Sequence, residues 1–187
     1  MFNLYDFDKT IYNGDSSVDF YLFCLKKDIK LIKFLPRQIK AIFLYKIRKI
    51  SKEEMKENFF SYLTAIENVD ILIEKFWTKK LKKIKEWYMK KRHENDIIIS
   101  ASPEFLLIPL IDILAVKSII GSKVDKKTGK FLSKNCYGIE KVKRLFKKYP
   151  NIKIKEAYSD SQSDFEMLKL ALEKYQVKGN KIIKLEI

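Results

Sequence analysis

The chain has few of the residues that support the commonest nucleophilic and thiol chemistries. Its 187 residues include one histidine, His93, and two cysteines, Cys24 and Cys136. His93 stands in a charged string, so Ser-His-Asp and Cys-His catalysis are excluded unless this single residue serves them. The two cysteines form neither a disulfide framework nor a metal-ligand pattern. Any catalytic site must therefore be built from carboxylates, hydroxyls and lysines.

Long uncharged segments are also missing. A membrane-spanning helix needs about 18–20 nearly uncharged residues, and no stretch of this chain approaches that length. Asp6 and Asp8 precede the first lysine, so we expect no signal peptide, which would begin with positive charge. The hydrophobic content of 47% predicts a folded core rather than disorder. Together these features favour a cytoplasmic protein.

Positive charge is in large excess and lies mainly in two segments. The chain has 39 Lys and Arg against 24 Asp and Glu, a net charge of +15. Residues 26–52 carry a net +9 and residues 75–92 a net +8, so the remainder sums to −2. Such segments attract phosphorylated substrates, anionic membrane surfaces or nucleic acids, or they form a lysine-rich solvated surface without a partner.

Hydrophobic patterning predicts an α/β fold with a Rossmann-like parallel sheet. Buried strands are expected at residues 2–7, 96–100, 118–120, 152–158 and 182–183. Helices are expected at residues 103–116, 141–149 and 165–175, with a hairpin excursion at 124–137. Strands that alternate with helices indicate that most of the sheet is parallel.

An all-helical insertion interrupts this pattern after the first strand. Residues 15–95 show helical periodicity in about four helices, without strand-like alternation. Ser51 and Glu54 form a capping-box pattern at the start of one of them. We therefore expect a catalytic core of residues 1–14 and 96–187 and a helical cap of residues 15–95, which contains both basic segments.

Polar residues follow the predicted strands at the edge where parallel sheets place their ligand sites. Asp6 and Asp8 end the first strand, and Ser100 ends the second. Asp160 follows the fourth strand, and Lys141 opens a helix. Carboxylates that lie close together repel one another and need a cation, and oxygen ligands suit Mg²⁺. The sequence therefore predicts a magnesium and phosphate site at this edge.

Four ordered segments resemble the motifs of the haloacid dehalogenase (HAD) superfamily. They are residues 6–10 (DFDKT), 98–103 (IISASP), 138–142 (GIEKV) and 158–164 (YSDSQSD). The helical insertion after the first motif resembles the C1-cap branch, subfamily IB, which contains phosphoserine phosphatase. The resemblance implies a Mg²⁺-dependent phosphomonoester hydrolase that forms an aspartyl-phosphate and acts on a small phosphorylated metabolite.

The resemblance also implies catalytic and metal-binding roles. Asp6 would be the nucleophile and Asp8 the general acid/base, while Lys141 would hold Asp6 and neutralise phosphate charge. Asp6, the backbone carbonyl of Asp8 and Asp160 would bind Mg²⁺. Asp164 would be a further metal ligand, or it would contact the metal ligands without binding the metal itself.

Phosphate and substrate contacts are implied for three more residues. Ser100 and the backbone N–H groups near Ala101, at the start of the following helix, would bind the phosphoryl group with Lys141. Asp15 aligns with the acid that grips the substrate amino group in phosphoserine phosphatases, and is one methylene shorter. Ser163 stands where those enzymes commonly have asparagine, and the chain has no clear counterpart of their cap arginine. Taken with the shorter acid at Asp15, these departures do not support a serine-like substrate.

Two other functions remain open at this point. One is a peripheral-membrane phospholipid-headgroup phosphatase that resembles phosphatidylglycerophosphate phosphatase. Its basic cap would lie on anionic headgroups and insert residues 31–32, 34–35 and 42–44. The other is a nucleic-acid-binding module, suggested by lysines interleaved with aromatics such as Trp77 and Trp87. Helical spacing of the aromatics indicates core packing and makes nucleic acid the less favoured partner.

Overall fold

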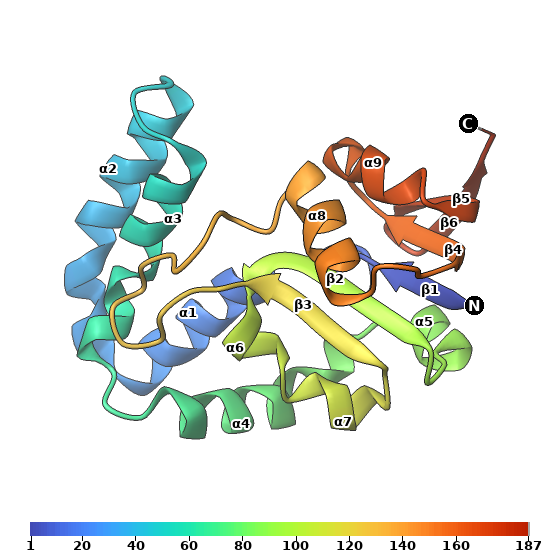
Figure 1. Ribbon diagram of the computed structural model, residues 1–187. Coiled ribbons are helices and arrows are strands. Elements are labelled where there is room, and N and C mark those ends of the chain that lie inside the picture. Colours follow the sequence, from blue (N-terminus) through green and yellow to red (C-terminus); the bar gives the residue numbers. More distant parts are fainter. Residues whose placement is uncertain (187) are drawn as a thin grey trace.

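The chain folds around one six-stranded sheet, and the computed structural model describes residues 1–186 (Figure 1). The strands are β1 (Phe2–Tyr5), β2 (Asp96–Pro103), β3 (Ser118–Ser122), β4 (Ile154–Ser159), β5 (Ala171–Lys178) and β6 (Lys181–Leu185). They lie in the order β3-β2-β1-β4-β5-β6. Neighbours from β3 to β5 are parallel, and β6 is antiparallel to β5. The predicted α/β fold with a mainly parallel, Rossmann-like sheet is confirmed.

Helical segments fill the connection between β1 and β2, which we call the helical insertion. It consists of α1 (Ser16–Lys27), η1 (Ile29–Phe34), α2 (Leu35–Lys46), α3 (Lys52–Phe60), η2 (Ser61–Ala65), α4 (Val69–Lys80), η3 (Leu81–Lys83) and α5 (Glu86–Lys91). Ser51 caps α3 as predicted, because its Oγ accepts a hydrogen bond from the N–H of Glu54 at 3.0 Å. Figure 1 shows α2 and α3 side by side, projecting beyond the sheet.

The remaining helices follow the later strands. They are α6 (Glu104–Leu107), α7 (Leu110–Leu114), α8 (Ile139–Lys148), η4 (Gln162–Asp164) and α9 (Phe165–Leu168). The helix predicted for residues 103–116 is thus two short helices. Pro109 separates them, since it has no N–H to continue the first helix.

The two faces of the sheet pack into two hydrophobic clusters. Tyr5, Ile98 and Tyr158 belong to the cluster that also contains side chains of α4, α6 and α7. Leu4 and Ile97, each next to one of these residues in the chain, pack with α8 and α9 on the other face. This alternation is what a strand buried on both sides requires.

Part of the helical insertion packs directly on the sheet. On α4, the Trp77 ring lies 6.0 Å from that of Phe7, and on α5 the Tyr88 ring lies 4.9 Å from that of Tyr5. The α2–α3 pair, in contrast, projects away from the sheet (Figure 1). The division into residues 1–14 plus 96–187 and residues 15–95 therefore stays a prediction.

The helix predicted for residues 165–175 is wrong beyond its first turn. The chain leaves α9 at Leu168 and runs as β5 from Ala171. Tyr175 stacks on Tyr158 of β4, with ring centroids 4.6 Å apart and planes 8° from parallel. Cross-strand stacking of this kind favours strand over helix. β6 returns through a tight turn at Gly179, which is why this last strand is antiparallel.

Candidate active site

A cavity of about 410 Å³ lies between the carboxyl ends of β1 and β2 and the projecting helices of the insertion. The sheet side contributes polar residues, among them Asp6, Asp8, Ser100, Lys141, Asp160 and Asp164. The insertion contributes mainly apolar ones, Val18, Ile42, Met55, Phe59 and Phe60, together with Lys52 and Lys56. All eight predicted site residues, including Ala101 and Asp15, line this one cavity.

Asp6 is held from both carboxylate oxygens. Its Oδ1 accepts a hydrogen bond from Lys141 Nζ at 2.6 Å, and its Oδ2 accepts one from Thr10 Oγ1 at 3.1 Å. Burial raises the pKa of Asp6 to about 7, although the Lys141 charge opposes the shift. A bound cation or a further positive group would favour the ionised form that a nucleophile needs.

Asp8 accepts hydrogen bonds from a different set of donors. The N–H of Ser16, in the first turn of α1, donates to Asp8 Oδ1 at 2.6 Å, and Ser102 Oγ donates to Oδ2 at 2.5 Å. Burial, followed by the nearby Asp15 charge, raises the pKa of Asp8 to about 6. A carboxyl group with this pKa can both give and take a proton near neutral pH.

Lys141 joins the first and fourth motifs. Its Nζ is buried and also donates to Asp164 Oδ2 at 2.7 Å, which in turn accepts from Ser159 Oγ at 2.7 Å. Burial alone would lower the pKa of Lys141, but the charges of Asp6 and Asp164 raise it above its usual value. Lys141 is therefore a fixed cation, and Asp164 is positioned chiefly as its partner.

Thr10 links the first motif to Asp160. Its Oγ1 accepts a hydrogen bond from the N–H of Asp160 at 2.9 Å and lies 3.4 Å from Asp160 Oδ1. Lys9 has a left-handed φ of +61°, so the chain turns sharply after Asp8 and brings Thr10 back over Asp6. One hydroxyl thus places the Asp6 and Asp160 carboxylates next to each other.

The second motif differs in detail from its predicted arrangement. Ser100 Oγ accepts a hydrogen bond from the N–H of Ser102 at 3.0 Å. Ala101 lies within β2, and the next helix begins only at Glu104, so the N–H of Ala101 is not at a helix start as we expected. Strand pairing with β3, at Pro103 and Ser122, extends the strand past the motif.

Lys56 is a cavity residue that sequence reasoning missed. From α3 its Nζ donates to the carbonyl of Ala101 at 2.8 Å and to Asn135 Oδ1 at 3.1 Å. Burial, and then the Lys52 charge, lower the pKa of Lys56 to about 8. Among 39 basic residues nothing in the sequence marked this one. Thr10 and Ser102, which were also missed, lie inside motifs and could have been found there.

Asp15 stabilises the start of α1 in addition to lining the cavity. It is the N-cap of α1, and its Oδ1 accepts a hydrogen bond from the N–H of Val18 at 3.0 Å. The Trp77 side chain, a candidate for stacking on nucleic acid, is buried and donates from Nε1 to the carbonyl of Leu106 at 2.6 Å. It is a core residue and offers no stacking surface.

The residues present fit a hard divalent cation, although not through every predicted ligand. Within residues 1–186 no three His, Cys, Asp or Glu side chains stand close enough together to hold a metal ion. Two carboxylates, those of Asp6 and Asp160, meet across Thr10 at the cavity. Asp164 Oδ1 is buried without a hydrogen-bond partner among the described residues. Oxygen donors of this kind suit Mg²⁺, whose shell also takes carbonyl and water oxygens.

The sequence also matches a known protein family. The haloacid dehalogenase-like hydrolase family matches residues 4–169, and the chain belongs to that family. The predicted superfamily is therefore confirmed, and the four motifs of this hydrolase family converge on one cavity. No curated protein matches the chain.

Solved structures share the fold at low sequence identity. A protein of unknown function from Bordetella pertussis Tohama I is 16% identical with a TM-score of 0.77, over 92% of this chain and 87% of that one. A phosphoserine phosphohydrolase-like protein from Francisella tularensis subsp. tularensis SCHU S4 is 18% identical with a TM-score of 0.55, over 92% and 85%. A probable phosphoserine phosphatase from Vibrio cholerae is 13% identical with a TM-score of 0.65, over 93% and 55%.

Among the described residues, no helix is long and apolar enough to cross a bilayer.

Proposed function

We propose that the chain is a Mg²⁺-dependent phosphomonoester hydrolase that works through an aspartyl-phosphate on Asp6. The observation that carries the proposal is that two carboxylates of the cavity have different hydrogen-bond partners. Asp6 is bound to the Lys141 cation, whereas Asp8 is bound only to the neutral donors Ser16 and Ser102. Two carboxyl groups in such different surroundings can divide nucleophile and acid/base work between them.

In the first step Asp6 would attack phosphorus and form an acyl phosphate, while the bond from phosphorus to the leaving oxygen breaks. The proton for that oxygen would come from Asp8. In the second step Asp8 would take a proton from water, the hydroxide would attack phosphorus, and the Asp6 carboxylate would leave. Lys141 would stabilise negative charge on the phosphoryl oxygens in both steps.

Phosphate and metal binding complete the proposed site. Ser100 and the backbone at Ala101 would contact the phosphoryl group beside Lys141. Asp6, the carbonyl of Asp8 and Asp160 would hold Mg²⁺, which supplies charge neutralisation of the phosphoryl oxygens when bound.

The substrate class is a small phosphorylated molecule whose leaving group reaches the wall formed by the insertion. A cavity of about 410 Å³ accommodates a metabolite and not a folded macromolecule. Its insertion side combines apolar side chains with the polar residues Asp15, Ser17, Lys52 and Lys56. A cytoplasmic location remains part of this proposal.

Hydrolysis of p-nitrophenyl phosphate by Asp6→Asn protein tests the assignment of the nucleophile. We expect turnover below about 1% of wild type, because an amide is neither a nucleophile nor an anionic ligand. Thr64→Ala, whose exposed hydroxyl only caps a carbonyl of η2, is the matched control and should keep its activity. Wild-type rates in Asp6→Asn would refute the proposal.

A further inference from the structure

One side of α2 carries an apolar stripe whose side chains are 37% to 59% exposed. Its side chains recur every three or four residues and therefore share one side of the helix. The α2 stripe comprises Leu35, Ile39, Ile42, Phe43 and Ile47. Ile39 is 57% exposed and Phe43 59% exposed, whereas the opposite side of α2 buries Gln38 and Ala41. Ile29 and Ile32 of η1 extend the exposed apolar area.

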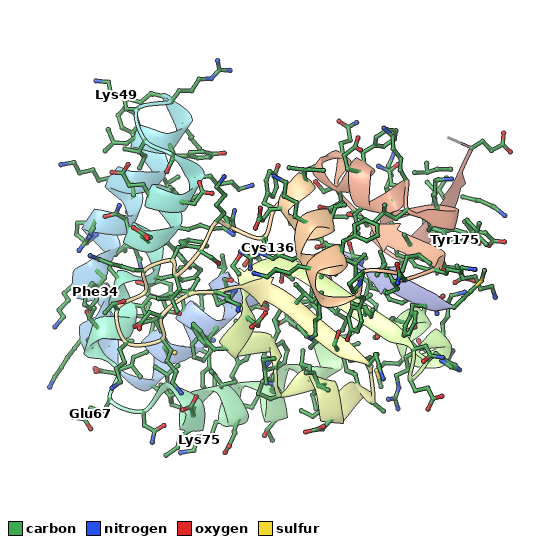
Figure 2. The ribbon with its side chains drawn as sticks, in the orientation of Figure 1. Phe34, Lys49, Glu67, Lys75, Cys136 and Tyr175 are labelled. Carbon is green, nitrogen blue, oxygen red and sulfur yellow. The ribbon has the colours of Figure 1, made fainter. Side chains whose placement is uncertain are left out.

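Exposed cations surround this stripe. Residues 29–49 contain seven Lys and Arg and no Asp or Glu, and all seven are exposed. Figure 2 shows Lys49 at the far tip of the α2–α3 pair, directed away from the sheet. A helix with an apolar side flanked by lysines has the composition of one that lies in the headgroup region of an anionic bilayer.

Other partners suit this surface less well. A nucleic acid would pair with the cations but would leave the isoleucines and Phe43 in contact with phosphate and water. A second copy of the chain would bury the isoleucines but bring two clusters of seven positive charges together. An anionic bilayer satisfies both the apolar and the charged parts of the surface.

We propose that η1 and the α2 stripe bind an anionic lipid bilayer. Ile42 belongs to the stripe and also lines the cavity, so docking would turn the cavity mouth toward the lipid surface. Phosphorylated molecules held at that surface would then reach the site directly. Leu31 and Phe34, which the sequence suggested as inserting residues, pack inward instead, and Leu31 is only 2% exposed.

Vesicle co-sedimentation of the full chain tests the proposal without requiring catalysis, so docking and the proposed hydrolase function can fail separately. The probes are vesicles of pure phosphatidylcholine and vesicles with about 30% phosphatidylglycerol. We expect binding to the anionic vesicles that weakens in 0.5 M NaCl, since salt screens surface charge. Ile39→Ser/Phe43→Ser and Lys40→Glu/Lys46→Glu should each weaken the binding at least about tenfold.

Matched variants on other surfaces control for lost hydrophobicity and charge. Leu132→Ser/Leu172→Ser removes two side chains that are 68% and 67% exposed, and Lys143→Glu/Lys153→Glu reverses two exposed lysines outside the insertion. Both should bind like wild type, and circular dichroism with urea unfolding should confirm that every variant folds. Equal binding to both vesicle types, stripe variants that bind as well as wild type, or stripe-dependent binding to polynucleotide or self-association in place of vesicle binding would overturn the proposal.

Discussion

Lys141 Nζ donates a 2.6 Å hydrogen bond to Asp6 Oδ1 across 135 positions of sequence, and both side chains are buried. The same ammonium group holds Asp164 at 2.7 Å. One cation therefore compensates two carboxylates at the junction of β1, α8 and the segment after β4. Removing that cation should affect stability as well as activity.

Lys141→Met should lower the free energy of unfolding by about 3–5 kcal/mol, because it leaves two buried carboxylates unpaired. The double variant Lys141→Met/Asp164→Asn should recover part of this loss, since one charge has gone, but no turnover. Urea unfolding of the single and double variants measures the effect. A single variant as stable as wild type would contradict the paired arrangement.

The loss of activity in Asp8→Asn should depend on the leaving group of the substrate. An alkyl leaving oxygen needs the proton that Asp8 would donate, whereas nitrophenolate leaves without one. We expect formation of the phosphorylated enzyme to fall by about 10²–10⁴ with an alkyl phosphate and much less with p-nitrophenyl phosphate. Rapid-quench measurement of the phosphorylated enzyme is the readout. Equal losses with both substrates would assign Asp8 another role.

Removal of divalent cations should abolish hydrolysis, because Asp6 and Asp160 would repel each other and the substrate phosphate. EDTA should reduce turnover to about 1% or less and Mg²⁺ should restore it. Ca²⁺ should inhibit, since its larger and looser ligand shell would misplace the nucleophile. Full activity in EDTA would show that Lys141 alone neutralises the negative charge of the site and that no divalent cation is needed.

Lys56 should make the free energy of unfolding rise with pH in the alkaline range. Its pKa falls from 10.5 to about 8 on folding, so between these values the unfolded chain binds more protons and stability rises with pH. Below about pH 8 the half-buried Lys56 is charged in the folded chain as well, and this stabilisation is lost. Between pH 7.5 and 9.5 the unfolding free energy of wild type should gain about 1–2 kcal/mol relative to Lys56→Met. Parallel pH profiles would show that Lys56 stays solvated.

The sheet side of the site could be predicted from sequence because its residues lie within short motifs at strand ends. Asp6, Asp8 and Asp160 meet because β1 and β4 are parallel in one sheet, and the alternation of strands with helices predicts a parallel sheet. Lys141 needed only the start of α8. Local signals were enough wherever the strand itself carries the side chain.

The remainder depends on contacts between distant segments. Lys56 acts through Ala101 and Asn135, and the path of α3 decides which lysine of the insertion reaches them. Residues 171–175 read as a helix because the stacking partner Tyr158 lies on another strand. Apolar spacing alone also could not tell that Leu31 faces inward while Ile39 faces solvent.

The loop between β3 and α8 contacts α3 at several residues of the helix. Phe131 N–H donates to Glu57 Oε1 at 2.9 Å, the Lys52 ammonium lies 3.3 Å from the centre of the Tyr137 ring, and Lys56 holds Asn135. Gly129 lies so close to Phe60 that a Cβ there would stand 2.5 Å from the Phe60 carbonyl oxygen. A swing of α3 away from the sheet would break these contacts together. Widening the cavity through α3 would therefore cost all of these contacts at once, so the loop between β3 and α8 holds the insertion side of the cavity in place.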